Sequence, residues 1–479
     1  MTELITPDIC VIGAGSGGLT VAAAAAAFGV SVVLIEQGKM GGECLNAGCV
    51  PSKALIAAAR RAHGATGLDA FGITTSPPQI DFAGVHKHVH RVIAAIAPND
   101  SRERFTGLGV RVIAGKARFK DKNTVAVGAD IEIKARRVVI ATGSSPAIPS
   151  IPGLERVPFL TNETVFDLAE CPAHLIVIGA GPMGLELAQA FRRLGAAVTV
   201  LEAGTALARE DTECARIVLE QLAAEGVVLR QGVSIAHVEA SGAGVAVVLS
   251  ADGGHEGAHE RITGSDLLIA TGRRVHVDGL NLDAAGIAHT AAGITVNRSM
   301  RTSNRRVYAI GDVTGGPQFT HAANYHAGLV IRNALFRLPV KADDSLIPRV
   351  TFTDPELAHV GLTEQEARRA RKTIRILRWP LAENDRAQAE RATRGHIKVI
   401  ADKGGRILGA TIVGAGAGEL ITTWSLALAN RLTIRAIVGT VVPYPTFGEI
   451  GKRAAITYFV PRLTSPFVRR IIGWVRRLG

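Results

Sequence analysis

Cysteine is scarce in this chain, with five residues among 479. A secreted protein held together by a disulfide framework needs many more, so the sequence excludes that class. It is typical of a cytosolic protein, in which a disulfide is usually catalytic. Cys10 lies in an apolar stretch, and Cys171 and Cys214 stand alone. Only Cys44 and Cys49 are close together in the sequence, so they are the pair that needs an explanation.

Aromatic residues are also few, at 4% of the chain. The formal net charge is +12, but five of the basic residues fall in the last 18 positions, which contain no acid. A basic balance concentrated in the tail, with few aromatic side chains for base stacking, argues against a nucleic-acid partner. No basic cluster precedes the first apolar run, so we expect no secretory signal and a cytoplasmic location.

One long uncharged run, residues 9–35, could suggest a membrane span, but glycines interrupt it repeatedly. The pattern predicts a strand, a tight turn, a helix and a second strand that ends on Glu36. Gly13, Gly15 and Gly18 form a G-x-G-x-x-G turn, which lets the backbone approach a pyrophosphate at the helix N-terminus. Glu36 can accept hydrogen bonds from a ribose hydroxyl, so the sequence predicts a dinucleotide site here.

The same pattern returns later in the chain, with Gly179, Gly181 and Gly184 in the turn and Glu202 at the end of the second strand. The first glycine and the acid are 23 residues apart in both copies. Two such units imply two bound dinucleotides. A carboxylate at Glu202 accepts a hydrogen bond from a free 2′-hydroxyl and repels a 2′-phosphate, so we predict that NADH is preferred over NADPH.

The two paired cysteines lie in residues 41–53, which read GGECLNAGCVPSK. A spacing of five residues is about one and a half helical turns, so both sulfurs can meet on one side of a slightly distorted helix. Lys53 lies one turn beyond Cys49, and a nearby cation favours thiolate over thiol. We interpret Cys44 and Cys49 as a redox-active pair that takes electrons from a bound flavin. The alternative is two buried structural cysteines at chance spacing.

This stretch resembles the redox motif of the class I pyridine nucleotide-disulfide oxidoreductases, or flavin disulfide reductases. That group includes dihydrolipoyl dehydrogenase, glutathione reductase and mercuric reductase. The motif departs from the usual family sequence only at Glu43, where the family usually has Thr. The resemblance spans about residues 5–460. It implies an α/β fold with two Rossmann-like dinucleotide-binding domains, one for FAD and one for NAD(P), and a C-terminal α+β dimerisation domain. It also implies that Cys49 faces the flavin and that Cys44 meets the substrate.

The resemblance also assigns cofactor residues outside the glycine turns. Residues 307–313 resemble a second FAD fingerprint, in which Asp312 holds the ribityl chain. The Ala-Thr-Gly triplets at 141–143 and 270–272 resemble the points where the chain crosses between domains. Glu186 matches a residue that pairs with Lys53 beside the flavin. The expected cofactor-binding residues are Gly13, Gly15, Gly18, Glu36, Gly42, Lys53, Gly143, Gly179, Gly181, Gly184, Glu202, Gly272, Gly311 and Asp312.

These assignments predict that the nicotinamide domain interrupts the FAD domain. The expected segments are residues 1–148 for the first part of the FAD domain, 149–271 for the NAD(P) domain, 272–342 for the second FAD part, 343–461 for the dimerisation domain and 462–479 for a basic tail. Alternating apolar strands in 343–461 predict an antiparallel sheet. The family uses this last domain to form a homodimer, so we expect one here.

The chain departs from the disulfide-reducing members of the family near its C-terminus. Where they carry a His as the acid–base group for the thiols, this chain has Tyr444, followed by the retained Glu449. A free Tyr has a pKa near ~10, so it is a poor proton shuttle at neutral pH. By resemblance, Tyr444 and Glu449 of one subunit line the substrate side of the other.

Three interpretations of the electron acceptor remain open. Mercuric reductases resemble this chain in having Tyr at position 444, and a pair of thiolates suits a soft metal ion. The chain has none of their adjacent C-terminal cysteines or their small N-terminal metal-binding domain. The first interpretation is therefore a mercuric reductase-like enzyme acting on a metal ion, a disulfide or another small electrophile. The second is dihydrolipoyl dehydrogenase, which Tyr444 opposes. The third is a membrane-associated flavoprotein with a docking tail.

Two further patterns bear on partners. Apolar residues at helical spacing alternate with arginines in 462–479, which is typical of a basic amphipathic helix on an anionic membrane surface. The alternative is a helix that packs on its own dimer. His86, His88 and His90 lie on one expected helix without nearby cysteines or carboxylates, so we expect them to face solvent and we predict no metal site.

Overall fold

The computed structural model describes residues 2–250, 260–370, 373–463 and 465–478. The chain divides into two compact units. One consists of Met1–Gly179, Ala190–Leu201 and Val233–Asp344, and the other of Ala180–Gln189, Glu202–Gly232 and Ser345–Gly479.

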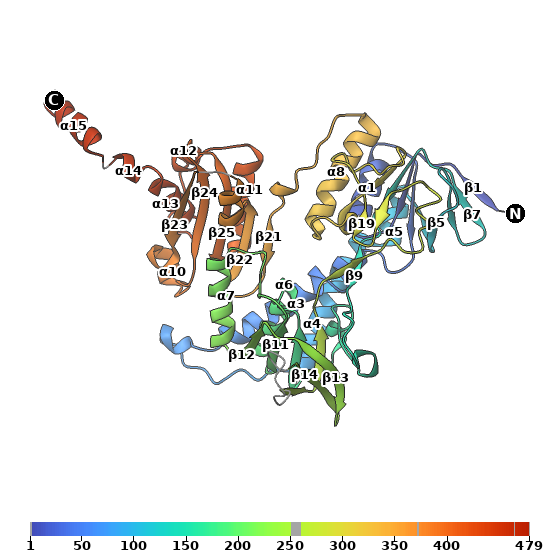
Figure 1. Ribbon diagram of the computed structural model, residues 1–479, viewed down its shortest axis with the longest axis horizontal. Helices are drawn as coiled ribbons and strands as arrows, with labels where there is room; N and C mark the ends of the chain where they lie inside the picture. Colours follow the sequence, from blue (N-terminus) through green and yellow to red (C-terminus); the bar gives the residue numbers. More distant parts are fainter. Residues whose placement is uncertain (1, 251–259, 371–372, 464, 479) are drawn as a thin grey trace. The chain divides into compact units, whose positions relative to one another are not determined.

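The first unit is built around a parallel sheet with the strand order β20-β8-β2-β3-β4. Its central strands are short apolar runs buried on both faces, which is typical of parallel sheets. In Figure 1, helices α1 and α8 lie side by side next to this sheet. The strands are β2 (Ile9–Ile12), β3 (Val32–Glu36), β4 (Arg111–Ala114), β8 (Arg137–Ile140) and β20 (Val307–Ala309). The helices are α1 (Ser16–Ala27), α2 (Gly42–Asn46), α3 (Cys49–Gly64), α4 (Phe82–Ile96), α5 (Arg102–Gly107) and α8 (Thr320–Phe336).

Alternate side chains of β2 enter two different cores, as the period of a strand requires. Ile9 and Val11 pack among side chains of α1 and α8. Cys10 and Ile12 pack on the other face, against the small sheet β1-β7-β6-β5. The strands of that sheet are β1 (Glu3–Ile5), β5 (Ala117–Phe119), β6 (Val125–Val127) and β7 (Ile131–Ile133). Cys10 is therefore a core residue, and burial raises the pKa of its thiol to about 12.

The second predicted strand–turn–helix–strand unit is also present, as β10 (His174–Ile178), α6 (Pro182–Arg193) and β11 (Ala197–Glu202). Strand β10 pairs in parallel with β11 on one side and with β16 (Asp266–Ile269) on the other. Nearby lies the antiparallel sheet of β13 (Ile235–Ser241), β14 (Gly244–Leu249) and β15 (Arg261–Gly264). A short antiparallel ribbon joins β9 (Ser144–Pro146) to β17 (Arg273–Val275), directly after the two Ala-Thr-Gly triplets. We call β9 and β17 the crossover ribbon.

The second unit contains the predicted antiparallel sheet, with the strand order β21-β22-β25-β24-β23. Trp424 of helix α11 is buried in its core. The strands are β21 (Arg349–Thr351), β22 (Glu356–Gly361), β23 (Ile374–Pro380), β24 (His396–Asp402) and β25 (Ile407–Gly414), with β12 (Val227–Gln231) elsewhere in the unit. The helices are α7 (Thr212–Ala224), α9 (Glu364–Ala370), α10 (Asp385–Ala389), α11 (Ala417–Ala429), α12 (Ile434–Gly439), α13 (Glu449–Thr457), α14 (Val460–Leu463) and α15 (Pro466–Val475).

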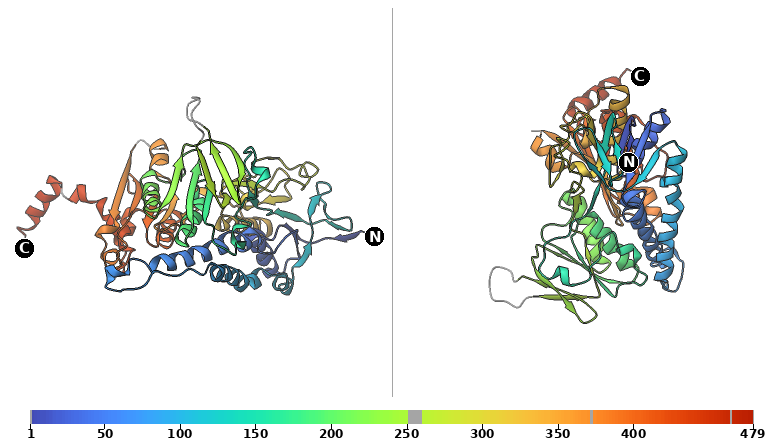
Figure 2. Two further views of the ribbon diagram at one scale, coloured as in Figure 1. Left: turned by 90° about the horizontal axis from the view of Figure 1, so that it is seen from below. Right: turned by 90° about the vertical axis from the view of Figure 1, so that its right-hand side faces the viewer.

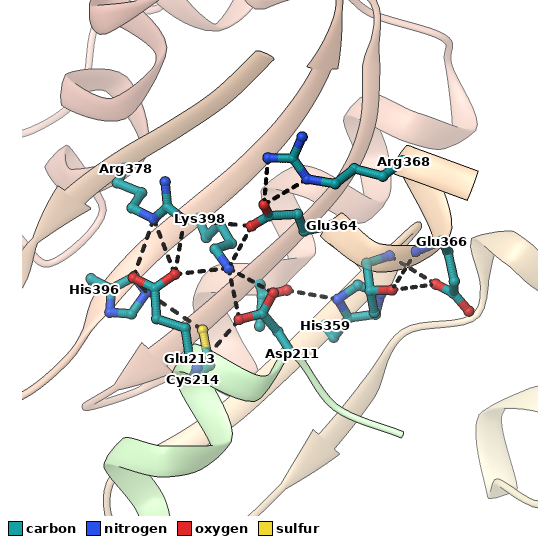
Figure 3. Close-up of polar contacts among 12 residues, drawn as sticks. Asp211, Glu213, Cys214, His359, Glu364, Glu366, Arg368, Arg378, His396 and Lys398 are labelled. Atoms are coloured by element: carbon teal, nitrogen blue, oxygen red, sulfur yellow. Dashed lines mark hydrogen bonds and ion pairs between the residues drawn. The ribbon is translucent and has the colours of Figure 1, made fainter. Parts of the chain in front are cut away.

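A cluster of charges around the buried Lys398, shown in Figure 3, holds helix α7 to this sheet. The ammonium group of Lys398 on β24 lies 2.8 Å from Asp211, 2.8 Å from Glu213 and 3.0 Å from Glu364. Arg378 on β23 and Arg368 on α9 supply the other cations. We call these six residues the Lys398 cluster, which contains three carboxylates and three cations.

The Lys398 cluster favours ionised carboxylates in spite of its burial. Burial alone would raise the pKa of Glu213, but hydrogen bonds from Arg378 and Lys398 outweigh it and lower the pKa to about 2. Glu364 shows the same balance, with Lys398 and Arg368 as donors, and its pKa is also lowered. The neighbouring His396 is buried, which lowers its pKa and keeps the ring neutral. Each carboxylate therefore has a cation at hydrogen-bonding distance.

The C-terminal helix α15 extends away from the five-stranded sheet, as the red segment in Figures 1 and 2 shows. Most of its apolar side chains are exposed, including Phe467 and Trp474. Among the described residues, no helix is both long and apolar enough to cross a membrane. Residues 464 and 479 of the predicted tail lie outside the described part of the chain.

Candidate functional site

The two paired cysteines lie at a break between two helices. Cys44 is in the short helix α2, and Cys49 is the first residue of the 16-residue helix α3. The prediction of one distorted helix is therefore wrong. The chain leaves the helical conformation at Ala47 (φ −149°) and Gly48 (φ −123°, ψ −113°). The break places the Cys49 thiol at the N-terminus of a long helix, where the helix dipole favours a thiolate.

Two features hold this turn closed. The side chain of Asn46 donates hydrogen bonds to the carbonyl oxygens of Met40 and Gly42, at 3.0 and 2.7 Å. A Cβ on Gly48 would lie 3.1 Å from the carbonyl oxygen of Glu43 and 3.3 Å from the Cα of Cys44. A side chain at this position would therefore crowd the backbone of Glu43 and Cys44, which would have to shift by a few tenths of an ångström.

The two thiols interact with each other. A hydrogen bond with Cys49 and then burial raise the pKa of Cys44. The Sγ of Cys49 lies 3.5 Å from the Oγ1 of Thr320, at the start of helix α8. Cys49 is exposed and Cys44 is half-buried. The hydrogen bond between the two thiols brings Cys44 and Cys49 together, as the prediction of a redox pair requires.

Both predicted glycine turns touch an Ala-Thr-Gly triplet through the backbone alone. A Cβ on Gly13, which has φ +103°, would lie 2.4 Å from the carbonyl oxygen of Ala141. A Cβ on Gly179, with φ +108°, would lie 2.4 Å from the carbonyl oxygen of Ala270. The redox motif approaches the first turn as closely, because a Cβ on Gly42 would lie 2.7 Å from the Cα of Gly15. Positive φ values are also found at Gly143, Gly272 and Gly311.

The glutamate at the end of the second strand accepts the same two backbone hydrogen bonds in both units. Glu36 accepts from the backbone N–H groups of Ala14 at 2.6 Å and Gly38 at 2.7 Å. Glu202 accepts from those of Ala180 and Gly204, both at 2.8 Å. Each carboxylate oxygen keeps a free lone-pair direction for a ribose hydroxyl. The internal repeat seen in the sequence therefore extends to the hydrogen bonds of both turns.

Sequence reasoning missed a polar network that joins Glu43 to Asp312. The guanidinium of Arg273 binds both carboxylate oxygens of Glu43, one of them at 2.7 Å. Its Nε donates to the Oγ of Ser144 at 2.7 Å and lies 3.5 Å from the carboxylate of Asp312. Asn162 donates to Glu43 at 2.6 Å and to the carbonyl oxygen of Ala47 at 3.0 Å. We call Glu43, Asn162, Arg273, Ser144 and Asp312 the Glu43 network.

These residues fit a bound FAD. The glycine turn leaves no room for a side chain near the backbone, Glu36 is oriented for a ribose, and Asp312 and Arg273 lie beside the redox motif. The Oδ1 of Asn162 is buried without a hydrogen-bond partner. A buried acceptor of this kind is normally satisfied, so it is consistent with a missing donor at this site.

The remaining predicted site residues lie as follows. Lys53 is half-buried on α3, one turn beyond Cys49. Glu186 is buried and accepts from the backbone N–H of Phe352 at 2.8 Å. Tyr444 is 67% exposed and donates to the carboxylate of Asp385 at 2.7 Å, a hydrogen bond that raises the pKa of its phenol. Glu449 begins α13 and forms an ion pair with Arg453 at 3.8 Å.

The three histidines of α4 do not all face solvent, which corrects the expectation for two of them. The rings of His86 and His90 contact each other with centroids 4.3 Å apart and planes tilted by 55°, and both are half-buried, while His88 is exposed. His90 lies 3.5 Å from the carboxylate of Asp167. Among the residues that the structure describes, no group of three or more His, Cys, Asp or Glu side chains could hold a metal ion.

The fold and the cysteine site together define a disulfide oxidoreductase with two dinucleotide sites, and comparison with known proteins gives the family. Residues 7–327 match the family described as pyridine nucleotide-disulphide oxidoreductase, and residues 347–455 match its dimerisation domain. The chain belongs to the pyridine nucleotide-disulphide oxidoreductase family. It is an α/β oxidoreductase with parallel-sheet dinucleotide-binding domains and a C-terminal dimerisation domain, and the family implies FAD and a pyridine nucleotide as cofactors.

The relatives include proteins of two named activities. The chain is 37% identical to the mercuric reductase of Lysinibacillus sphaericus, over 94% of this chain and 82% of that protein. It is 36% identical to the dihydrolipoyl dehydrogenase of Geobacillus stearothermophilus, over 94% of this chain and 96% of that protein. Among solved structures, the Cu(II) complex of the HOCl-induced flavoprotein disulfide reductase RclA from Escherichia coli has a TM-score of 0.84 at 27% identity, covering 94% of this chain and 99% of that one.

Proposed function

We propose that the protein transfers two electrons from NAD(P)H to a Cys44–Cys49 disulfide and then to a small acceptor. FAD, when bound, relays the electron pair between the nicotinamide and the disulfide. The hydride breaks the S–S bond, leaving one thiol and one thiolate and releasing NAD(P)⁺. Oxidation of this thiol–thiolate pair to the disulfide gives the acceptor two electrons and releases a proton. The observation that supports this most is the contact between the two cysteines at the N-terminus of α3.

In this proposal, different residues of the chain bind the cofactors and carry out the reaction. Glu36, Gly42, Gly311 and Asp312 hold the flavin, and the turn from Gly179 to Gly184 holds the nicotinamide dinucleotide. Cys49 faces the flavin, with Lys53 and Glu186 at its reactive end, and Cys44 meets the acceptor. The segments 1–148, 149–271, 272–342 and 343–461 are the proposed domains, and the last one pairs two copies so that Tyr444 and Glu449 reach the partner's site.

Anaerobic reduction by NADH tests the role of the cysteines. The wild-type holoenzyme should develop a long-wavelength thiolate-to-flavin absorbance band. Cys44→Ser should keep this band, and Cys49→Ser should lose it, while both lose about 10³-fold in turnover. A wild-type holoenzyme without the band, or two cysteine variants with unchanged turnover, would refute the proposal.

For the acceptor, we propose a mercuric reductase-like activity on a soft metal ion. Tyr444 supports it, because an exposed phenol with a raised pKa cannot serve as the proton shuttle that a dithiol substrate needs. The test is NADH-dependent release of volatile mercury from a thiol-buffered Hg(II) salt, with Cys44→Ser as the control. Failure there, combined with brisk dihydrolipoamide oxidation, would favour dihydrolipoyl dehydrogenase. A Tyr444→His variant should raise dihydrolipoamide turnover, by roughly 100-fold if it acts as a general base.

We also propose that NADH is preferred over NADPH. The carboxylate of Glu202 is fixed by two backbone N–H groups, so it cannot turn away from a 2′-phosphate without losing them. Glu202→Ala should therefore bring the ratio of kcat/KM for NADH to kcat/KM for NADPH closer to one. A wild-type enzyme with the higher kcat/KM for NADPH would contradict this assignment.

A cytoplasmic protein that touches an anionic membrane surface through α15 is a second candidate role. The support is the exposure of the apolar side chains of α15, with arginines at 469, 470, 476 and 477 and no acid. Binding to vesicles containing phosphatidylserine should disappear when residues 462–479 are deleted. If the deletion leaves vesicle pelleting unchanged, the membrane role is wrong, and the alternative is that α15 packs within the dimer.

A further inference from the structure

Glu43 is the position where this chain departs from the usual redox motif, and it is the centre of the Glu43 network. A Thr at this position could not form the bidentate ion pair that Glu43 makes with Arg273. Arg273 begins β17 of the crossover ribbon, and Ser144 begins β9, the other strand. The ion pair therefore ties helix α2, which carries Cys44, to the strands that follow both Ala-Thr-Gly triplets.

Arg273 cannot easily leave this position. Its side chain is only 17% exposed, and it also donates to the carbonyl oxygen of Ser144 at 3.0 Å. Ser144 in turn donates to Asp312 at 2.5 Å. A guanidinium held on both strands of the ribbon presents a fixed positive charge to the carboxylate beside the cysteines.

The charges of the Glu43 network do not cancel. Glu43 and Asp312 contribute two carboxylates, and Arg273 is the single cation between them. Burial raises the pKa of Glu43 in spite of the ion pair with Arg273, and the charges of Asp312 and an ionised Cys49 raise it further. Glu43 directly precedes Cys44 in helix α2, so a negative charge on Glu43 lies beside the cysteine pair and opposes formation of a thiolate there.

We propose that Glu43 and Arg273 together set the protonation of the reduced Cys44–Cys49 pair. The carboxylate opposes formation of the thiolate, and the guanidinium offsets the carboxylate. Glu43 is thus a positioning residue whose charge acts on the cysteines, in a chain that has Tyr444 where the family has an acid–base His. The inference rests on the proposed role of these cysteines. The charged and titratable groups around the pair are Glu43, Arg273, Asp312 and Lys53, with Asp100 beside Gly41.

A double-mutant cycle tests this proposal in the FAD-loaded protein. The variants are Glu43→Gln, Arg273→Gln and the combination of both. The measured quantities are the pH midpoint of the long-wavelength thiolate band after anaerobic reduction with NADH, and the pH dependence of iodoacetamide alkylation after reduction. Glu43→Gln should lower the midpoint by about one pH unit, which is about tenfold in thiolate fraction below the midpoint. Arg273→Gln should raise the pH midpoint, and the midpoint of the double variant should be close to that of the wild type.

The opposite signs separate an electrostatic role from a structural one. A residue needed only for folding would shift both single variants in the same direction or leave both midpoints unchanged, and either result would overturn the proposal. Glu43→Asp should keep a midpoint near the wild type because it retains the charge. The exposed pair Glu3–Arg111 provides matched controls, Glu3→Gln and Arg111→Gln, which should not move the midpoint.

The same experiment distinguishes the two proposals. If the wild-type protein shows no thiolate band and no reducible cysteine pair, the proposed function fails. If the band is present but the two charge variants do not shift in opposite directions, only the role of Glu43 and Arg273 fails.

Discussion

The Lys398 cluster and the Glu43 network each surround a cation whose side chain is mostly buried, Lys398 or Arg273, but the balance of charge differs between them. In the Lys398 cluster three cations face three carboxylates, and the pKa values of Glu213 and Glu364 are lowered. In the Glu43 network one cation serves two carboxylates, and the pKa of Glu43 is raised. The comparison teaches that burial alone does not mark a functional site. Under the proposed role of Cys44 and Cys49, the incompletely neutralised carboxylate beside them is the better marker of a functional site.

The largest effect on stability should come from Lys398. Lys398→Met removes the cation that three carboxylates share at a site where the Lys is 3% exposed. Removing one partner of a buried ion pair leaves uncompensated charge, so we expect a loss of about 3–5 kcal/mol in the free energy of unfolding. Urea denaturation measures it, with the exposed Lys403→Met as the control. The pH midpoint of the thiolate band should not change. A shifted midpoint would show that the Lys398 cluster, like the Glu43 network, acts on the cysteines, and would contradict the comparison.

Acid should weaken the Lys398 cluster in a defined pH range. The pKa of Glu213 is about 2 in the folded protein, below its value in the unfolded chain, so its contribution is complete above about pH 4.5. That contribution is lost as the pH falls from there towards 2. A Glu213→Gln, Glu364→Gln double variant should therefore show a flatter dependence of unfolding free energy on pH between 5 and 3. Equal slopes in the variant and the wild type would contradict the assignment.

Removing the carboxylate of Glu43 should change stability much less. We expect Glu43→Gln to lower the free energy of unfolding by about 1 kcal/mol, because Gln keeps an acceptor for Arg273 and Asn162. The raised pKa means that ionised Glu43 subtracts stability as the pH rises. The difference from the wild type should thus narrow towards alkaline pH in urea titrations. A loss as large as that of Lys398→Met would make Glu43 a structural residue.

The smallest effect should come from the edge of the Lys398 cluster. Arg368 pairs with Glu364 one helical turn away, and its side chain is 60% exposed. Exposed pairs at this spacing are worth about 0.3–0.5 kcal/mol, so Arg368→Gln should fall within that range by chemical denaturation. A larger loss would show that the third cation matters as much as the buried Lys.

Local patterns in the sequence predict much of this structure. The 23-residue spacing of each glycine turn from its acid predicts both strand–helix–strand units, and Glu36 and Glu202 form the same two hydrogen bonds. Alternating apolar residues predict the strands β24 and β25 correctly. These signals work because each depends on residues that lie close together in the chain.

Long-range contacts are what the sequence could not reveal. Arg273 reaches Glu43 across 230 residues and Asn162 reaches it across 119, and neither residue belongs to a local motif. Lys398 lies in a strand whose apolar residues alternate in sequence, where a Lys ordinarily faces solvent, but in the fold it is buried and pairs with Asp211 before α7 and Glu364 on α9. The break between α2 and α3 was also missed, although Gly48 was a local signal for it.

The contact of Gly13 with Ala141 and that of Gly179 with Ala270 have a consequence for engineering the cofactor sites. Both turns meet the following triplet through main-chain atoms, so no side chain at these glycines can be used to select one dinucleotide over another. If the two turns hold the dinucleotides as proposed, selectivity would be redesigned at the carboxylates of Glu36 and Glu202 and in the residues that follow them. Under the same proposal, a library that varies residues 202–205 should return enzymes with altered nicotinamide choice, whereas one that varies the glycines should lose the bound dinucleotide.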